Sequence, residues 1–127
     1  ARIGQIDRLD TGADGGPLVL DYKTESPQKP RDRVKHPTED TQLAFYAALQ
    51  PDDTVRAAYI NIGEREGTLP EEQHDVVAVR DALIEGILHD MRRIREGAPL
   101  PALGDGAVCD YCAARGLCRR DFWSDPA

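Results

Sequence analysis

The sequence contains no hydrophobic run long enough to cross a membrane and no apolar segment of the kind that directs secretion. It has only three cysteines among 127 residues, and this odd number of thiols favours the reducing cytoplasm. Its net charge of −7 argues against broad, charge-driven binding of DNA by the chain as a whole. We therefore expect one soluble, cytoplasmic domain with its chemistry in a few local motifs.

The most informative motif lies in the first two dozen residues. Asp7 is followed by a glycine-rich turn signal over residues 11–17, a short apolar run over residues 18–20, and then Asp21 and Lys23. If the two segments are neighbouring strands of a hairpin, the two carboxylates can converge. Lys23 then points to the same face as Asp21, because side chains two residues apart lie on one face of a strand.

Such a group of side chains suits metal-dependent phosphate chemistry. A carboxylate at the end of a buried strand is costly unless a cation or hydrogen bonds compensate it. Mg²⁺ takes oxygen ligands from one or two carboxylates, water and phosphate, and a lysine supplies further positive charge. The alternative is structural: Asp7 pairs with Arg2 or Arg8 at the surface, and Asp21 and Lys23 form an ordinary ion pair.

Three ordered blocks extend this pattern. They are Gly4-x-Ile6-Asp7-Arg8-Leu9-Asp10, Asp21-Tyr22-Lys23-Thr24 and Gln42-Leu43-x-x-Tyr46. Together they resemble the RecB-like branch of the PD-(D/E)xK nucleases, which includes the nuclease domains of RecB and AddB.

The resemblance implies an α/β, restriction-endonuclease-like fold, with a mixed central sheet flanked by helices. It also implies a Mg²⁺- or Mn²⁺-dependent DNA exonuclease that processes DNA ends in recombinational repair, fused to or associated with a helicase. The residues that it assigns are Asp7, Asp21 and Lys23 as the catalytic group, Asp7, Asp21 and the backbone carbonyl of Tyr22 as metal ligands, and Gln42 and Tyr46 as supporting residues on a helix.

A cluster near the C-terminus contains every cysteine of the chain, in the spacing Cys109-x2-Cys112-x5-Cys118. Thiolates bind Zn²⁺ or an iron–sulfur cluster, but both usually need four ligands, and His74 or His89 could complete a zinc site. Three reduced thiols, or one disulfide and a free thiol, are the structural alternative. The resemblance implies a [4Fe–4S] cluster whose fourth cysteine lies far upstream, and this sequence contains no such cysteine.

The chain begins at Ala1, almost inside the first expected strand, and has no initial methionine. We therefore expect it to be a piece of a longer protein. Within it, residues 1–100 would form the nuclease core without its upstream part, and residues 101–127 an irregular, cysteine-containing tail. Related nucleases draw an upstream helix across the site, so this piece alone is expected to be inactive.

Basic residues follow the second expected strand at Lys29, Arg31, Arg33 and Lys35. Their positive charges could contact DNA phosphates near the metal. The alternative is a solvated loop with too much proline for regular structure.

The remaining pattern predicts a helix that begins near Thr38 and runs toward Leu49, a strand over residues 55–62, a polar segment over residues 64–73 and a long helix over residues 76–95. This order supports an α/β domain with a mixed sheet. A catalytically inactive, nuclease-like module that binds DNA ends or a partner helicase, stabilised by a cysteine-bound metal, is the alternative function.

Overall fold

The computed structural model describes residues 1–101 and 109–118. The described elements, in chain order, are β1 (Arg8–Thr11), β2 (Pro17–Lys23), α1 (Gln28–Lys35), α2 (Gln42–Ala47), β3 (Arg56–Gly63), β4 (Gly67–Glu72), α3 (Val76–Arg95) and α5 (Arg115–Cys118). The chain forms two compact units, Ala1–Leu88 and His89–Ala127. The whole sheet belongs to the first unit.

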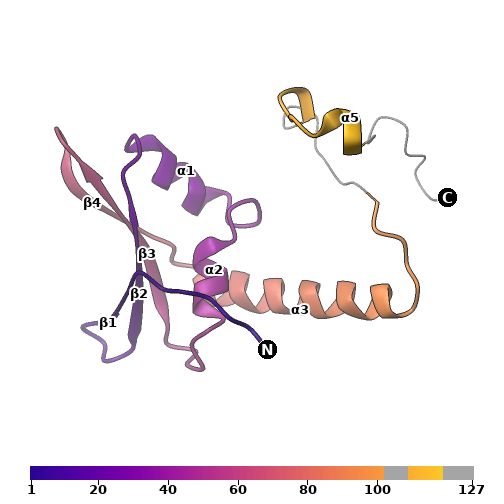
Figure 1. The fold of residues 1–127 in the computed structure, drawn as a ribbon. Helices are drawn as coiled ribbons and strands as arrows, with labels where there is room; N and C mark the ends of the chain where they lie inside the picture. Colours follow the sequence, from indigo (N-terminus) through magenta and orange to yellow (C-terminus); the bar gives the residue numbers. More distant parts are fainter. Residues whose placement is uncertain (102–108, 119–127) are drawn as a thin grey trace. The chain divides into compact units, whose positions relative to one another are not determined.

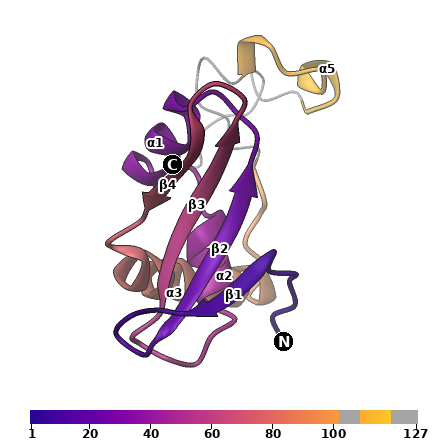
Figure 2. The ribbon, with the colours of Figure 1, turned by 90° about the vertical axis from the view of Figure 1, so that its left-hand side faces the viewer.

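The four strands form one sheet in the order β1-β2-β3-β4 (Figure 2). β1 pairs antiparallel with β2, β2 parallel with β3, and β3 antiparallel with β4. The parallel pair requires a crossover, which the chain makes through α1 and α2. This mixed sheet with flanking helices confirms the predicted α/β fold class.

The turn between β1 and β2 is built by glycines. Gly12 and Gly16 close it with a backbone hydrogen bond of 2.8 Å, and Gly15 adopts a φ of 83°, which residues with a Cβ rarely adopt. The carboxylate of Asp14 accepts a hydrogen bond from the Gly16 N–H. A tight hairpin therefore fixes the register of the first two strands.

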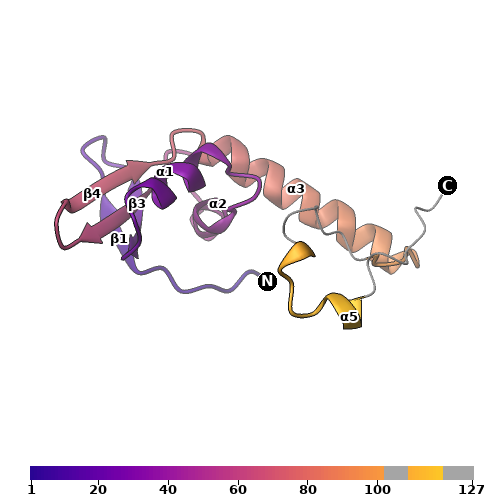
Figure 3. The same ribbon diagram turned by 90° about the horizontal axis from the view of Figure 1, so that it is seen from above.

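The hydrophobic core lies between one face of the sheet and the helices. Val19, Ala57 and Tyr59 supply the sheet side of this core, and Leu43 and Ala47 of α2 supply the helix side. Figures 1 and 3 show α1 and α2 on the same side of the sheet. We call this covered face the site face, because Asp21 and Lys23 alternate with Tyr22 and therefore lie on it.

The opposite face of the sheet carries Leu20, Tyr22, Ile60 and Ile62 (viewed in Figure 2). The helices within residues 1–88 all lie behind the sheet in that view. Tyr22 and Ile62 are accordingly 39% and 48% exposed.

Two predictions about the segment between β2 and β3 were wrong. Residues 28–35 form helix α1 instead of a proline-rich loop, because Pro30 lies in the first helical turn, where its missing N–H costs no helical hydrogen bond. The next helix begins at Gln42 instead of near Thr38, and Thr41 precedes it as the N-cap residue without a side-chain capping bond.

The segment predicted as merely polar contains β4, an edge strand that pairs with β3. By contrast, the long helix α3 has the predicted bounds, Val76–Arg95. The first strand begins later than expected, at Arg8, so Asp7 lies directly before it. Within the described residues, no helix is both long and apolar enough to cross a membrane.

Candidate active site

The β1–β2 hairpin brings Asp7 and Asp21 together. In its register Arg8 faces Leu20, so the next position along aligns Asp7 with Asp21. Oδ2 of Asp7 accepts a hydrogen bond of 3.0 Å from the backbone N–H of Tyr22. This bond ties the residue before β1 to the strand that carries the second carboxylate.

Asp21 is 2% exposed, and Oδ2 of its carboxylate lies 2.9 Å from Nζ of Lys23. Burial raises the pKa of Asp21, the charge of Lys23 opposes the rise, and the nearby carboxylate of Asp7 adds to it. Among the described residues no donor has good hydrogen-bond geometry toward Asp21 Oδ2. The site therefore holds a buried, incompletely compensated carboxylate beside a second one.

Lys23 is held by three neighbours. Its ammonium contacts Asp21, donates a hydrogen bond of 2.8 Å to Oε1 of Gln42, and lies 5.4 Å from the centre of the Tyr59 ring. Gln42 in turn donates through Nε2 to the hydroxyl of Tyr46, at 3.2 Å. The structure thus brings Asp7, Asp21, Lys23, Gln42 and Tyr46 into one connected group.

The donor set fits a hard divalent cation. Asp7 and Asp21 offer carboxylate oxygens, and the buried Oδ2 of Asp21 has an ionic contact with Lys23 but no hydrogen-bond partner among the described residues, so a cation would compensate it further. Within the described part of the chain, no group of three or more His, Cys, Asp or Glu side chains could hold a metal. Two carboxylates, supplemented by a backbone carbonyl such as that of Tyr22 and by water, are nevertheless a usual ligand set for Mg²⁺.

The four predicted DNA-binding bases lie on α1 in different environments. Arg31 pairs with Glu71 of β4 at 2.9 Å, and Arg33 pairs with the carboxylates of Glu25 and Asp40. Lys29 and Lys35 are exposed and take part in none of the described ion pairs. Only the two lysines therefore present an uncompensated charge among these four residues.

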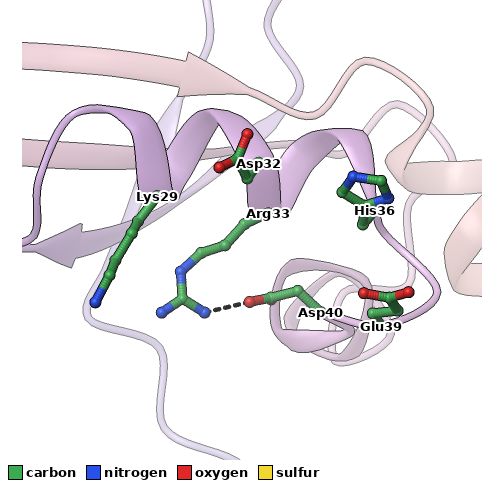
Figure 4. Close-up of a pocket in the computed structure, with 6 residues that line it drawn as sticks. All are labelled: Lys29, Asp32, Arg33, His36, Glu39 and Asp40. Atoms are coloured by element: carbon green, nitrogen blue, oxygen red, sulfur yellow. Dashed lines mark hydrogen bonds and ion pairs between the residues drawn. The ribbon is translucent and has the colours of Figure 1, made fainter. Parts of the chain in front are cut away.

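Arg33 lines two pockets at the surface. The first, of about 390 Å³, is lined by Lys29, Asp32, Arg33, His36, Glu39 and Asp40 (Figure 4). The second, an open groove of about 660 Å³, is lined by Gly4, Gln5, Arg33, Glu39, Asp40, Thr41, Gln42, Phe45 and Tyr46. The groove therefore runs beside the residues that hold Lys23.

Sequence reasoning missed a polar network beneath the site. The hydroxyl of Tyr59 donates to Asp40 at 2.6 Å, and the amide of Asn61 exchanges two hydrogen bonds with the backbone of Glu25. These partners are 19 and 36 residues apart, so spacing gives no signal for them. Asn61, a polar residue in the apolar half of the predicted strand, was the one available indication.

The cysteines belong to the second compact unit. Cys109 and Cys118 are half-buried, Cys112 is exposed, and none of the three forms a disulfide within the described residues. As the structure describes this part of the chain, the three cysteines are not arranged as a group that could hold a metal ion. Of the predicted tail at residues 101–127, residues 102–108 and 119–127 lie outside the described residues.

Neither the curated proteins nor the solved structures include a significant match to this chain. The family model described as the PD-(D/E)XK nuclease superfamily matches residues 3–119. This match includes the whole sheet, the carboxylate pair, Lys23 and all three cysteines. The chain belongs to the PD-(D/E)XK nuclease superfamily.

Proposed function

We propose that this chain is a metal-dependent DNA nuclease domain of the RecB/AddB-like type, acting as an exonuclease on DNA ends in recombinational repair. The observation that carries the proposal is the buried carboxylate of Asp21, in ionic contact with Lys23 and aligned with Asp7. Membership of the nuclease superfamily supports phosphodiester hydrolysis as the reaction.

The proposed roles follow from the chemistry of each group. Asp7 and Asp21 would hold Mg²⁺ or Mn²⁺, with the Tyr22 backbone carbonyl as a further ligand. The bound cation would supply a water of lowered pKa and would neutralise charge on the scissile phosphate. Lys23 would stabilise the charge that develops there or orient the attacking water, because its ammonium is fixed on both sides.

Gln42 and Tyr46 support the reaction indirectly in this proposal. Gln42 uses its amide oxygen for Lys23 and its amide nitrogen for Tyr46, so the helix α2 restrains the lysine side chain. A restrained ammonium loses little freedom when the phosphate arrives. The groove beside these two residues is a suitable path for the DNA strand.

Lys29 and Lys35 are the bases that we assign to the DNA backbone, since they are exposed and outside the described ion pairs. A helicase that is fused to this chain or associated with it would deliver a DNA strand to the site. We place this activity in the cytoplasm, where an odd set of reduced cysteines is favoured.

We further propose that Cys109, Cys112 and Cys118 bind a [4Fe–4S] cluster with a fourth ligand from outside this chain. Their clustering in ten residues supports this assignment. Iron and sulfide analysis of the anaerobically purified parent protein, with its visible spectrum, tests it. Four irons and four sulfides per chain are expected, and zinc alone would overturn the cluster assignment.

Cleavage of linear DNA tests the nuclease assignment itself. Asp21→Asn and Lys23→Met should each reduce Mg²⁺-dependent cleavage by the parent protein about 10³-fold or more, because each removes charge from the reacting centre. Asp10→Asn is the matched control, since Asp10 is an exposed carboxylate that pairs only at the surface with Arg8. If both site variants of the parent protein cleave at the wild-type rate, cleavage does not depend on Asp21 and Lys23. That result would favour the alternative, a non-catalytic module that binds DNA ends.

A further inference from the structure

Arg33 is engaged by two carboxylates at once. Its Nη2 lies 2.6 Å from Oε1 of Glu25, its Nε donates to Oε2 of the same carboxylate at 3.1 Å, and its Nη1 pairs with Asp40. Figure 4 shows the side chain of Arg33 directed at Asp40. A guanidinium whose two edges are both occupied has little capacity left for a DNA phosphate.

Glu25 and Asp40 are both anchored to β3, the first through its backbone and the second through its carboxylate. Asn61 is fully buried and holds the backbone of Glu25 through two hydrogen bonds, of 3.1 and 2.9 Å. Tyr59 is 1% exposed and donates its hydroxyl to Asp40 at 2.6 Å. The contacts therefore form a closed circuit. It starts at Tyr59 of β3, passes through Asp40, Arg33 and Glu25, and returns to β3 at Asn61.

This circuit lies next to the lysine of the candidate active site. In the β2–β3 register Tyr59 faces Asp21 and Asn61 faces Lys23, all on the site face. The Tyr59 ring has Nζ of Lys23 at 5.4 Å and Cζ of Arg33 at 5.9 Å from its centre. The two cations are thus arranged around one aromatic ring.

Several cations near the Tyr59 ring act on the carboxylate of Glu25. Hydrogen bonding by Arg33 holds the pKa of Glu25 below its usual range, and the charges of Lys29 and Lys23 act in the same direction. Without Arg33, Glu25 and Asp40 would lose their shared cationic partner, and Glu25 already attracts the ammonium of Lys23 electrostatically. They would attract that ammonium away from Asp21.

We infer that Arg33 is a positioning residue: by neutralising Glu25 and Asp40, it leaves Asp21 and Gln42 as the partners of Lys23. The inference rests on the proposed function insofar as it concerns the rate of cleavage. It replaces the expectation that Arg33 binds DNA phosphate.

Steady-state cleavage of linear duplex DNA with Mg²⁺ separates the two roles in the parent protein. Arg33→Met should lower kcat about 10- to 100-fold with little change in KM, because the lysine is misplaced. The double variant Arg33→Met/Glu25→Gln should recover most of this loss. Arg56→Met is the control, since Arg56 also forms a forked pair with one carboxylate, Glu72, but on the opposite face of the sheet.

A phosphate contact predicts a different pattern and would overturn the inference. In that case Arg33→Met would raise KM, reduce the slope of log affinity against log salt by about one, and leave kcat unchanged. Arg33→Lys provides a milder variant should the methionine variant not fold. Its single ammonium cannot fork between two carboxylates, so we expect a smaller loss of kcat than for methionine.

NMR of ¹³Cε-labelled lysine gives a readout that does not require cleavage. Arg33→Met should shift the Cε signal of Lys23 in the protein without DNA, and Arg56→Met should not. Unchanged Lys23 signals in the Arg33 variants would overturn the inference. A wild-type protein that cleaves no DNA would instead overturn the proposed function, while the NMR comparison still decides the position of Lys23.

Discussion

Lys23 donates a hydrogen bond of 2.8 Å to Gln42, and this bond joins the end of β2 to the first residue of α2. The chain between them contains α1, so the contact joins two residues that are 19 positions apart in the sequence. The same glutamine donates to Tyr46 one helical turn later, which limits the rotation of its amide. One side chain therefore links the lysine, the helix and the groove beside them.

Replacement of Gln42 should slow cleavage without preventing folding. Gln42→Met keeps the length of the side chain but removes the acceptor for Lys23, and we expect kcat to fall about 10- to 100-fold. Gln28→Met is the control, because Gln28 also makes a side-chain hydrogen bond, to Asp32, but on the exposed side of α1. Equal rates for the two variants would show that Gln42 does not restrain Lys23.

The raised pKa of Asp21 predicts a pH-dependent cost in stability. Its folded-state pKa exceeds the ordinary value of 3.8, so its contribution is favourable at pH below 3.8 and is lost as pH rises through the folded-state pKa. At neutral pH the native state carries the cost of a buried charge. Asp21→Asn should therefore raise the free energy of unfolding at pH 7, and this difference should shrink toward pH 3.

Urea unfolding without divalent metal at several pH values provides the measurement. Asp10→Asn, which alters an exposed carboxylate, should change the stability by no more than about 1 kcal/mol at any pH. A stability gain for Asp21→Asn that is the same at pH 3 and pH 7 would contradict the assignment of the effect to the buried charge.

A divalent cation should stabilise the folded protein through Asp21. A ligand that binds only the native state at 100 times its Kd adds about 2.7 kcal/mol, so Mn²⁺ should raise the Tm of the wild type. The rise should be lost in Asp21→Asn and retained in Asp10→Asn. A calorimetric scan with and without Mn²⁺ measures this, and an equal rise in Asp21→Asn would place the cation elsewhere.

Gly4 lies close to the side chains of Phe45 in α2 and of Leu49 just after it. A Cβ at this position would lie 2.9 Å from Cδ1 of Leu49 and 3.1 Å from Cε1 of Phe45. Both atoms belong to the ends of side chains that can shift, so Gly4→Ala should lower the free energy of unfolding by no more than about 1 kcal/mol and displace these side chains slightly. Thermal unfolding should report the change.

Gly86→Ala is the matched control for that substitution. Gly86 lies inside α3, and no atom would lie within 4 Å of an added Cβ. Alanine should stabilise the helix there by about 0.5–1 kcal/mol, because it is less flexible than glycine in the unfolded chain. Destabilisation by both alanines would show that the Gly4 effect is not steric.

The parts of the fold that depend on local pattern were predicted from the sequence. The apolar period of α3 is strong over twenty residues, and the glycine-rich turn between β1 and β2 announces the hairpin. The alignment of Asp7 with Asp21 follows from that hairpin. The group formed by these acids and Lys23 is therefore a local feature of the chain.

The errors arise where tertiary structure decides. β4 is polar and contains Pro70, both acceptable in an edge strand that pairs on one side only. The ion pairs of Arg33 were missed because sequence cannot show that Glu25 and Asp40 approach it from two directions. The connection of Asp40 to Tyr59 depends on how α2 docks on the sheet, which no short-range spacing encodes.

The β1–β2 turn has a consequence for the evolution of the site. Side chains alternate between the two faces of a strand, so a shift of one residue in the pairing of β1 with β2 would carry Asp7 to the face opposite Asp21. An insertion or deletion in residues 12–16 that shifts this pairing would therefore separate the two acids, whereas a substitution there leaves the count of residues between them unchanged. The length of a loop that contains no candidate catalytic group thus governs whether the two acids can act together.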